Sequence, residues 1–288
     1  MRPARAGPRN TKGRRTVKPR IGIVGYGVVG RSMHTLFGDD AIGFDVDGTE
    51  EDRRRINQCE AAFVSVPTPV APDGRCDISI VEEVVSWLET PLIVLRSTVA
   101  PGTTESLRQR HEKRIIFQPE YIGETASHPL ADVRTHDFLI FGGPLEDCSR
   151  AARIYQRYYH SEVRFFFTDS RTAEVAKYME NSFYAIKVMF CNEFYDIAKS
   201  HGVDYNELRE VWLADPRISR DHTFVYPDNR GFSGKCLPKD VSAIIHSAKA
   251  HGYEPRLMEA VMDINEDYRV EDGTYEPYRR KTKVNARS

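Results

Sequence analysis

Residues 21–30 read Ile21-Gly22-Ile23-Val24-Gly25-Tyr26-Gly27-Val28-Val29-Gly30, a short apolar strand that runs into glycines at the spacing G-x-G-x-x-G. A helical stretch follows to about Phe37, and a second strand, Ile42–Val46, contains Asp45. The glycines permit a tight turn and let a pyrophosphate approach the N-terminus of the helix, while the acid accepts hydrogen bonds from a ribose. This order predicts a dinucleotide-binding fold. We expect cofactor contacts from Gly25, Tyr26, Gly27, Val28, Val29, Gly30 and Asp45.

The acid at the end of the second strand also predicts which dinucleotide binds. The negative charge of Asp45 would repel a 2′-phosphate, so NAD is favoured over NADP. Asp47 is the alternative acid for this role.

Further strands and helices alternate along the first half of the chain. Strands are predicted at Ala62–Val66, Leu92–Leu95, Ile115–Phe117, Phe138–Phe141 and Val163–Phe167, with helices at Asp77–Leu88 and about 146–158. Such alternation predicts a doubly wound, mainly parallel sheet that binds its ligands at the carboxyl ends of the strands. Three of these ends carry polar residues, namely Thr68, Ser97-Thr98 and Glu120. We expect the three to form one site.

The second half predicts an all-α domain built on one long central helix. No Pro or Gly interrupts the chain from Thr172 to about His201, and further helices are expected at about 204–213, 238–251 and 256–266. Glu174, Lys177 and Asn181 share one face of the long helix. That face is either a solvated surface on which Glu174 pairs with Lys177, or part of a site. The density of apolar residues on this helix favours a partner subunit, with burial inside the chain as the alternative.

One cysteine lies in the segment Gly231-Phe232-Ser233-Gly234-Lys235-Cys236-Leu237-Pro238-Lys239-Asp240, between a glycine loop and a helix start marked by Pro238. A helix N-terminus and the nearby Lys239 would favour the thiolate, so Cys236 is a candidate nucleophile. A structural cysteine in a loop is the alternative.

Composition and charge limit the classes of protein. Residues 1–20 carry eight basic residues and residues 279–288 carry five, with no acid in either segment. Removing those 13 from the 41 basic residues leaves 28 against 42 acidic ones. We therefore expect a disordered basic arm at 1–20, a basic tail at 269–288 and an acidic body, which argues against a nucleic-acid-binding core.

Compartment and metal content are predicted from what the sequence lacks. No apolar run has the length of a membrane span, and no secretory signal follows the arm. The five scattered cysteines form no C-x-x-C pair and no zinc spacing, which favours a reducing cytoplasm and no metal site.

Several short motifs occur in a fixed order. They are the glycine turn, Val66-Pro67-Thr68-Pro69, Ser97-Thr98-Val99, Pro119-Glu120, Glu174-Val175-Ala176-Lys177 with Asn181, Asp215-Pro216-Arg217-Ile218 and the cysteine segment. From about residue 20 to 266 this series resembles the UDP-glucose/GDP-mannose dehydrogenase family, in a short form that lacks the family's C-terminal nucleotide-binding domain. The resemblance implies NAD-dependent oxidation of the C6 alcohol of a nucleotide sugar such as UDP-glucose to the carboxylate, in nucleotide-sugar metabolism and polysaccharide biosynthesis. It implies an NAD-binding Rossmann-like domain at 21–169 and a helical, dimer-forming domain at 170–268 that carries the catalytic cysteine.

The resemblance also implies roles for single residues. Cys236 captures the aldehyde as a thiohemiacetal that becomes a thioester, Lys177 and Asn181 stabilise oxyanions, and Glu120 activates water. Thr98 and Asp240 join the proton and water network. Further cofactor contacts are implied for Pro67, Thr68, Ser97, Thr98 and Lys239, and substrate contacts for Glu120, Tyr121, Ile122, Glu124, Lys177, Asn181, Arg217, Phe232 and Gly234.

Two other functions remain open from the sequence. One is a two-electron NAD-dependent hydroxyacid dehydrogenase that uses Lys177 and Asn181 and needs no cysteine. The other is a non-catalytic NAD-binding remnant that pairs with a full-length dehydrogenase.

Overall fold

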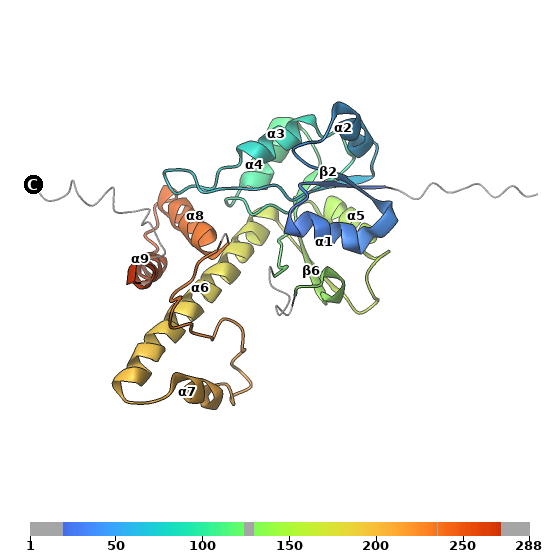
Figure 1. Ribbon diagram of the computed structural model, residues 1–288. Helices are drawn as coiled ribbons and strands as arrows, with labels where there is room; N and C mark the ends of the chain where they lie inside the picture. The colour runs from blue at the N-terminus through green and yellow to red at the C-terminus, as the bar shows by residue number, and fades with distance from the viewer. Residues whose placement is uncertain (1–19, 124–129, 235, 272–288) are drawn as a thin grey trace, which may run out of the picture.

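A seven-stranded sheet forms the first half of the molecule in the computed structural model, which describes residues 20–123, 130–234 and 236–271 (Figure 1). The strand order is β2-β1-β3-β4-β5-β6-β7, and every neighbouring pair is parallel except β5 and β6. The strands are β1 (Ile21–Val24), β2 (Ala41–Phe44), β3 (Ala61–Val64), β4 (Ile93–Leu95), β5 (Ile115–Phe117), β6 (Phe138–Gly142) and β7 (Arg164–Thr168).

Helices cover both faces of the sheet. They are α1 (Val28–Phe37), α2 (Glu50–Asn57), α3 (Ser79–Trp87), α4 (Thr103–His111) and α5 (Leu145–Tyr155). One core cluster joins the strands to α1 and α5, and a second joins them to α2, α3 and α4. Because β1 and β3 are covered on both faces, every residue of these two strands is buried.

The second half is a helical region attached to the sheet by α6 (Ser170–Ser200). This helix begins where the Asp169 side chain accepts a hydrogen bond from the Thr172 N–H, 2.9 Å away. The helices α8 (Leu237–Ala250) and α9 (Arg256–Glu271) pack against α6, and α7 (Tyr205–Trp212) lies near its C-terminal end (Figure 1). A separate core cluster, which includes Ala185, Met189 and Val241, fills the space between α6, α8 and α9.

The predicted fold class is confirmed, since a mainly parallel sheet is followed by helices on a long central one. Two helices, α2 and α4, were not predicted. The second strand ends at Phe44, so that Asp45 follows it, and the helix expected at 256–266 continues to Glu271. Residues 1–19 and 272–288, where the basic arm and most of the basic tail are expected, lie outside the described residues.

The interpretation of Glu174 and Lys177 as a solvated pair is wrong. Glu174 is fully buried, and its carboxylate accepts hydrogen bonds from the Gly102 and Thr104 N–H groups at 2.5 and 2.8 Å. It thus caps the start of α4 and ties α6 to the sheet domain. Burial raises the pKa of Glu174 above its ordinary value.

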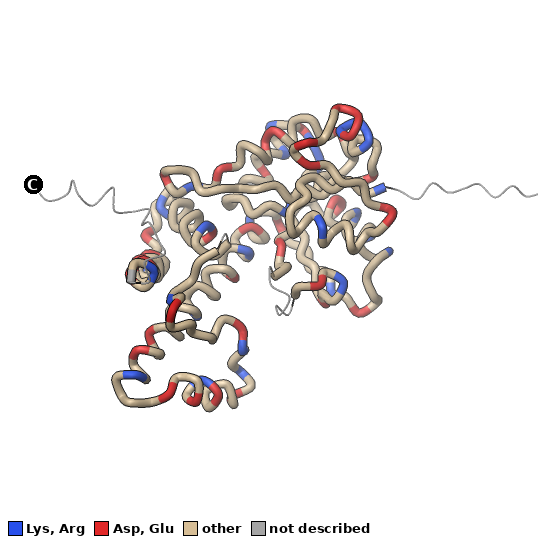
Figure 2. Tube along the Cα trace, viewed as in Figure 1, with Lys and Arg blue, Asp and Glu red and all other residues tan. Residues whose placement is uncertain are grey.

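Charged residues of both signs are interspersed along the described chain, on the sheet domain and on the helices alike (Figure 2). Within the described ranges, no helix combines the length and the apolar character needed to cross a bilayer.

Candidate active site

Two adjoining cavities lie where the carboxyl ends of the central strands face the N-terminus of α8. The first has a volume of about 650 Å³ and the second about 380 Å³. Residues that line both are Val28, Val29, Ser65, Val66, Pro67, Thr68, Gly234, Cys236 and Lys239. The first cavity extends from the glycine turn toward α8 and α9. The second reaches the polar residues at the ends of β4 and β5 and the buried face of α6.

The three glycines of the turn differ in what they permit. Gly25 has a φ of +89°, and a Cβ on Gly30 would lie 2.0 Å from the Gly25 carbonyl oxygen. Both positions therefore require glycine for the fold itself. Gly27 is different, because a Cβ at this position would meet no atom within 4 Å. This residue also lines the first cavity. The open space beside Gly27 would admit a pyrophosphate.

Two polar groups add to this fit. The Ser65 hydroxyl is buried beside both cavities and has no hydrogen-bond partner among the residues that the structure describes. The Asp45 carboxylate accepts hydrogen bonds from the N–H groups of Tyr26 and Val46, at 3.2 and 2.9 Å, and so lies against the turn. These residues fit a dinucleotide, whose ribose and phosphates would occupy the space around the turn.

The two glycines give a matched pair of variants. We expect Gly30→Ala to lower the free energy of unfolding by about 1–3 kcal/mol, because its methyl group collides with the Gly25 carbonyl. Gly27→Ala should leave that free energy almost unchanged and weaken NAD binding at least about tenfold, because its methyl group takes space that the pyrophosphate needs. Urea unfolding and NAD titration measure the two effects. Equal NAD affinity in Gly27→Ala and the unmodified chain would contradict this placement.

A chain of buried polar side chains lines the second cavity. Lys177 Nζ donates to Asn181 Oδ1 over 3.3 Å, and Asn181 Nδ2 donates to Asp240 Oδ2 over 2.5 Å. Asp240 also forms an ion pair with Lys239, with 2.5 Å between Oδ1 and Nζ. Lys177 has a second partner in Glu180, whose Oε2 lies 3.5 Å from Nζ. Donors and a cation are therefore fixed in place where a developing negative charge could be stabilised.

Another carboxylate, Glu120, is held in place near the end of β5. Its Oε2 forms an ion pair with Arg96, and its Oε1 accepts a hydrogen bond of 2.5 Å from the Ile122 N–H. Arg96 is itself buried and donates to Gln118 Oε1 and Tyr155 Oη at 2.6 and 2.8 Å. The guanidinium therefore balances the charge of a carboxylate that would otherwise be costly to bury.

The cysteine segment places its thiol at the junction of the two cavities. Cys236 immediately precedes α8, Pro238 lies in the first turn of that helix, and Cys236 is the exposed one of the five cysteines. No disulfide joins any of the five. Burial raises the pKa of the thiols of Cys59 and Cys148 to about 11, and raises those of Cys76 and Cys191 as well. Cys236 is therefore the cysteine best placed to react with a ligand in either cavity.

The structure brings most of the predicted site residues together. The second cavity is lined by Val28, Val29, Pro67, Thr68, Ser97, Thr98, Glu120, Tyr121, Ile122, Lys177, Asn181, Gly234, Cys236, Lys239 and Asp240. Thr68 Oγ1 donates to the Thr98 carbonyl over 2.7 Å, which links two of the strand ends as expected.

Two predicted substrate residues are placed differently, and a third is not tested. The side chain of Phe232 is buried in the core between α6, α8 and α9, and its N–H donates to Asn265. Arg217 lines neither cavity; its side chain is 85% exposed and forms an ion pair with Asp215. Glu124 lies outside the described residues.

Several side chains of the second cavity were not predicted as site residues, among them Arg96, Glu180, Tyr184 and His222. Glu180 and Tyr184 follow Lys177 by three and seven positions on α6, so the helical spacing could have found them. Arg96 directly precedes Ser97 at the end of a buried strand, where a cation needs a partner. His222 carries no local signal, because only the tertiary fold brings its loop to the cavity.

Two models of one protein family match this chain. Residues 46–159 match the NAD binding domain of the UDP-glucose/GDP-mannose dehydrogenase family, and residues 171–267 match the central domain of that family. The UDP-glucose 6-dehydrogenase of Pseudomonas aeruginosa is 32% identical over 223 residues, which are 72% of this chain and 48% of that protein.

Solved structures are similar as well. A UDP-glucose dehydrogenase from Pyrobaculum islandicum has a TM-score of 0.74 and 28% identity, over 86% of this chain and 68% of that one. A 3-hydroxyisobutyrate dehydrogenase from Mycobacterium tuberculosis shares the fold alone, with a TM-score of 0.67 and 15% identity over 90% of this chain and 96% of that one. The chain spans about half the length of the Pseudomonas protein and of a similar protein from Bacillus subtilis.

Proposed function

The chain belongs to the UDP-glucose/GDP-mannose dehydrogenase family, and from that premise we propose that it oxidises the C6 alcohol of a nucleotide sugar to the carboxylate. NAD is the cofactor. The observation that carries the proposal is the meeting of Cys236 with Lys177, Asn181 and Asp240 in one cavity beside the glycine turn. A thiol, a buried cation and fixed donors are the groups that a covalent oxidation of an alcohol requires.

In the proposed mechanism, the residues of the glycine turn would hold NAD, and one NAD would accept a hydride in each of the two oxidations. The Cys236 thiolate adds to the carbonyl carbon of the intermediate aldehyde and forms a C–S bond. Lys177 and Asn181 stabilise the oxyanion of the thiohemiacetal. After the second oxidation the product is a thioester, so the reactive aldehyde never leaves the site.

Hydrolysis then frees the carboxylate. Glu120, fixed by Arg96 and the Ile122 N–H, accepts the proton of the attacking water. The C–S bond breaks, and the electron pair returns to the Cys236 sulfur as thiolate. Asp240 receives hydrogen bonds from Asn181 and Lys239 and keeps both oriented toward the cavity.

NADH formation with three nucleotide sugars tests the proposal. Purified protein with NAD and, separately, UDP-glucose, UDP-N-acetylmannosamine and GDP-mannose should form NADH with at least one of the three. These are the sugars named for solved dehydrogenases of similar fold. NAD binding without NADH formation from any of them would contradict an enzymatic role. That result would favour the second candidate function, an NAD-binding unit that pairs with a longer dehydrogenase.

We also propose a homodimer formed through α6. Six apolar side chains on this helix are 39–75% exposed and follow one another at intervals of three, four or seven residues, namely Val175, Met179, Phe183, Phe190, Phe194 and Ile197. Such a stripe on a 31-residue helix is too large for a surface that stays in water, and a second copy would bury it.

One charged substitution on this stripe tests whether the dimer forms. Phe190→Glu should shift the protein from dimer to monomer in sedimentation equilibrium, because a carboxylate would have to be buried at the interface. Val211→Glu is the matched control, since Val211 is 69% exposed on α7 and off the stripe. A monomeric unmodified protein at micromolar concentration would contradict the proposal.

A cytoplasmic role in nucleotide-sugar metabolism, supplying uronic acids to polysaccharide biosynthesis, belongs to the same proposal. The absence of disulfides among the five cysteines supports the reducing compartment.

A further inference from the structure

One wall of the second cavity consists of side chains that carry out no step of the proposed mechanism. Glu180 and Tyr184 come from α6, and His222 comes from the loop between α7 and α8. The imidazole of His222 stacks on the Tyr184 ring, with 4.3 Å between centroids and 19° between planes. The pair is a flat aromatic surface that also carries a hydroxyl and ring nitrogens.

The backbone at His222 is held in an uncommon conformation. Its φ of +59° lies in the left-handed region, which non-glycine residues seldom adopt and which a surrounding structure must maintain. The next residue supplies that restraint. Thr223 is fully buried, its Oγ1 accepts from Arg209 Nε at 2.8 Å, and its carbonyl accepts from Tyr205 Oη at 2.9 Å.

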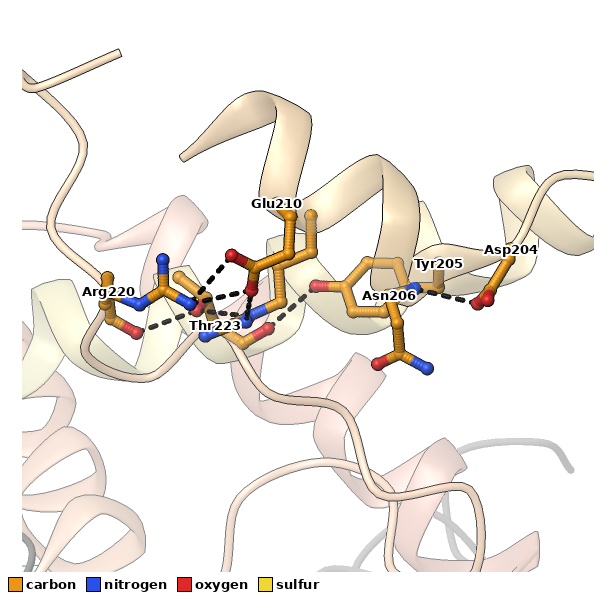
Figure 3. Close-up of polar contacts among 7 residues, drawn as sticks. Asp204, Tyr205, Asn206, Glu210, Arg220 and Thr223 are labelled. Carbon is orange, nitrogen blue, oxygen red and sulfur yellow. Dashed lines mark hydrogen bonds and ion pairs between the residues drawn. The ribbon is translucent and has the colours of Figure 1, made fainter. Parts of the chain in front are cut away.

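A second contact fixes the other side of the same loop. Arg220 donates to both carboxylate oxygens of Glu210 at 2.7 and 2.9 Å, and its carbonyl accepts from Thr223 Oγ1 at 2.7 Å. Figure 3 shows these contacts, which join the loop to α7 at Arg220 and at Thr223. We call this set the α7 clamp: Tyr205, Arg209, Glu210, Arg220 and Thr223. Because it maintains a strained residue at a cavity wall, the clamp indicates a functional position.

The charges at this wall indicate which part of a ligand it suits. Burial, followed by the negative charges of Glu180 and Asp221, raises the pKa of the Tyr184 hydroxyl. Glu180 lines the cavity beside this aromatic pair, and its carboxylate oxygens can accept hydrogen bonds from hydroxyl groups. A flat aromatic surface edged by acceptors is suited to a sugar ring, which has apolar C–H faces and hydroxyl groups around its edge.

We propose that Tyr184 and His222 form the subsite for the hexose ring of the nucleotide sugar, with Glu180 accepting a hydrogen bond from a ring hydroxyl. This inference rests on the proposed function and deepens it, since it makes His222 a specificity-determining residue for the sugar.

Calorimetric titration separates the sugar from the rest of the ligand. The ligands are UDP-glucose, UDP-N-acetylmannosamine, GDP-mannose, UDP, GDP and NAD. Asparagine tolerates the left-handed conformation, so His222→Asn removes the ring while it keeps the backbone. It should weaken binding of the nucleotide sugar about tenfold or more and leave the affinities for the matching diphosphate and for NAD unchanged. His246→Asn is the matched control, because His246 is half-buried on α8 and lines neither of the two main cavities.

The outcomes distinguish the two levels of the proposal. Equal losses for the nucleotide sugar and its diphosphate, or no loss for either, would overturn the hexose subsite and leave the proposed function standing. An unmodified protein that binds NAD but none of the three nucleotide sugars would overturn both. If thermal unfolding shows that His222→Asn does not fold, His222→Gly tests the same prediction, since glycine adopts the same φ without strain.

Discussion

Cys236→Ser should lower the rate of NADH formation by more than about a thousandfold, while NAD binding stays unchanged. A serine hydroxyl is far less nucleophilic than a thiolate at neutral pH, and no other described cysteine is exposed. Without a thiohemiacetal, the aldehyde formed in the first step has no covalent anchor. The rate is measured with the nucleotide sugar that the unmodified protein uses best.

Thiol labelling gives this prediction an independent readout. A neutral alkylating reagent should modify one thiol in the folded protein and none in Cys236→Ser, since the other four cysteines are buried. Cys59→Ser is the matched control for activity. The Cys59 thiol donates to the Arg55 carbonyl over 3.5 Å, a hydrogen bond that a hydroxyl can keep. Undiminished turnover by Cys236→Ser would favour the two-electron hydroxyacid dehydrogenase over the covalent mechanism.

Lys177→Met should lower kcat by about a hundredfold to a thousandfold, with a smaller change in KM for the nucleotide sugar. Lys177 is 8% exposed and its Nζ is held by Asn181 and Glu180, so the positive charge is already in place before an oxyanion forms. Methionine retains the length of the side chain and removes the charge. Steady-state rates measured over a range of sugar concentrations separate kcat from KM.

The control for this variant lies on the same helix. Lys199→Met removes an exposed lysine from the last turn of α6 and should leave kcat unchanged. Thermal unfolding of Lys177→Met must also be measured, because the substitution leaves Glu180 without its cation. A kcat within threefold of the unmodified value, in a variant that folds normally, would remove Lys177 from the mechanism.

Elements with a strong local sequence signal were predicted, and most elements without one were not. The strands β1 and β5 have the predicted bounds because both are short, fully buried apolar runs between turn residues. The helix α2 was missed although its start is readable, since Thr49 and Asp52 form a capping box. The helix α4 gives a weak signal because its sequence is largely polar. Its start is instead capped by Glu174, which lies seventy residues later in the chain.

The site residues were likewise predictable where a local pattern marks them. Helical spacing placed Lys177 and Asn181 on one face, and the strand-end rule placed Thr68, Thr98 and Glu120 in one cavity. Spacing could not show that Asn181 binds Asp240, because α6 and α8 meet only through tertiary packing. The same limit applies to His222, whose left-handed conformation depends on the α7 clamp.

The measurement that tests the central claim most directly is the amount of NADH formed for each uronic acid produced from a limiting amount of nucleotide sugar. Oxidation of an alcohol to a carboxylate releases four electrons, so covalent capture at Cys236 predicts a ratio of two, with no aldehyde in solution. A ratio of one, with an aldehyde or ketone as the final product, would contradict the account.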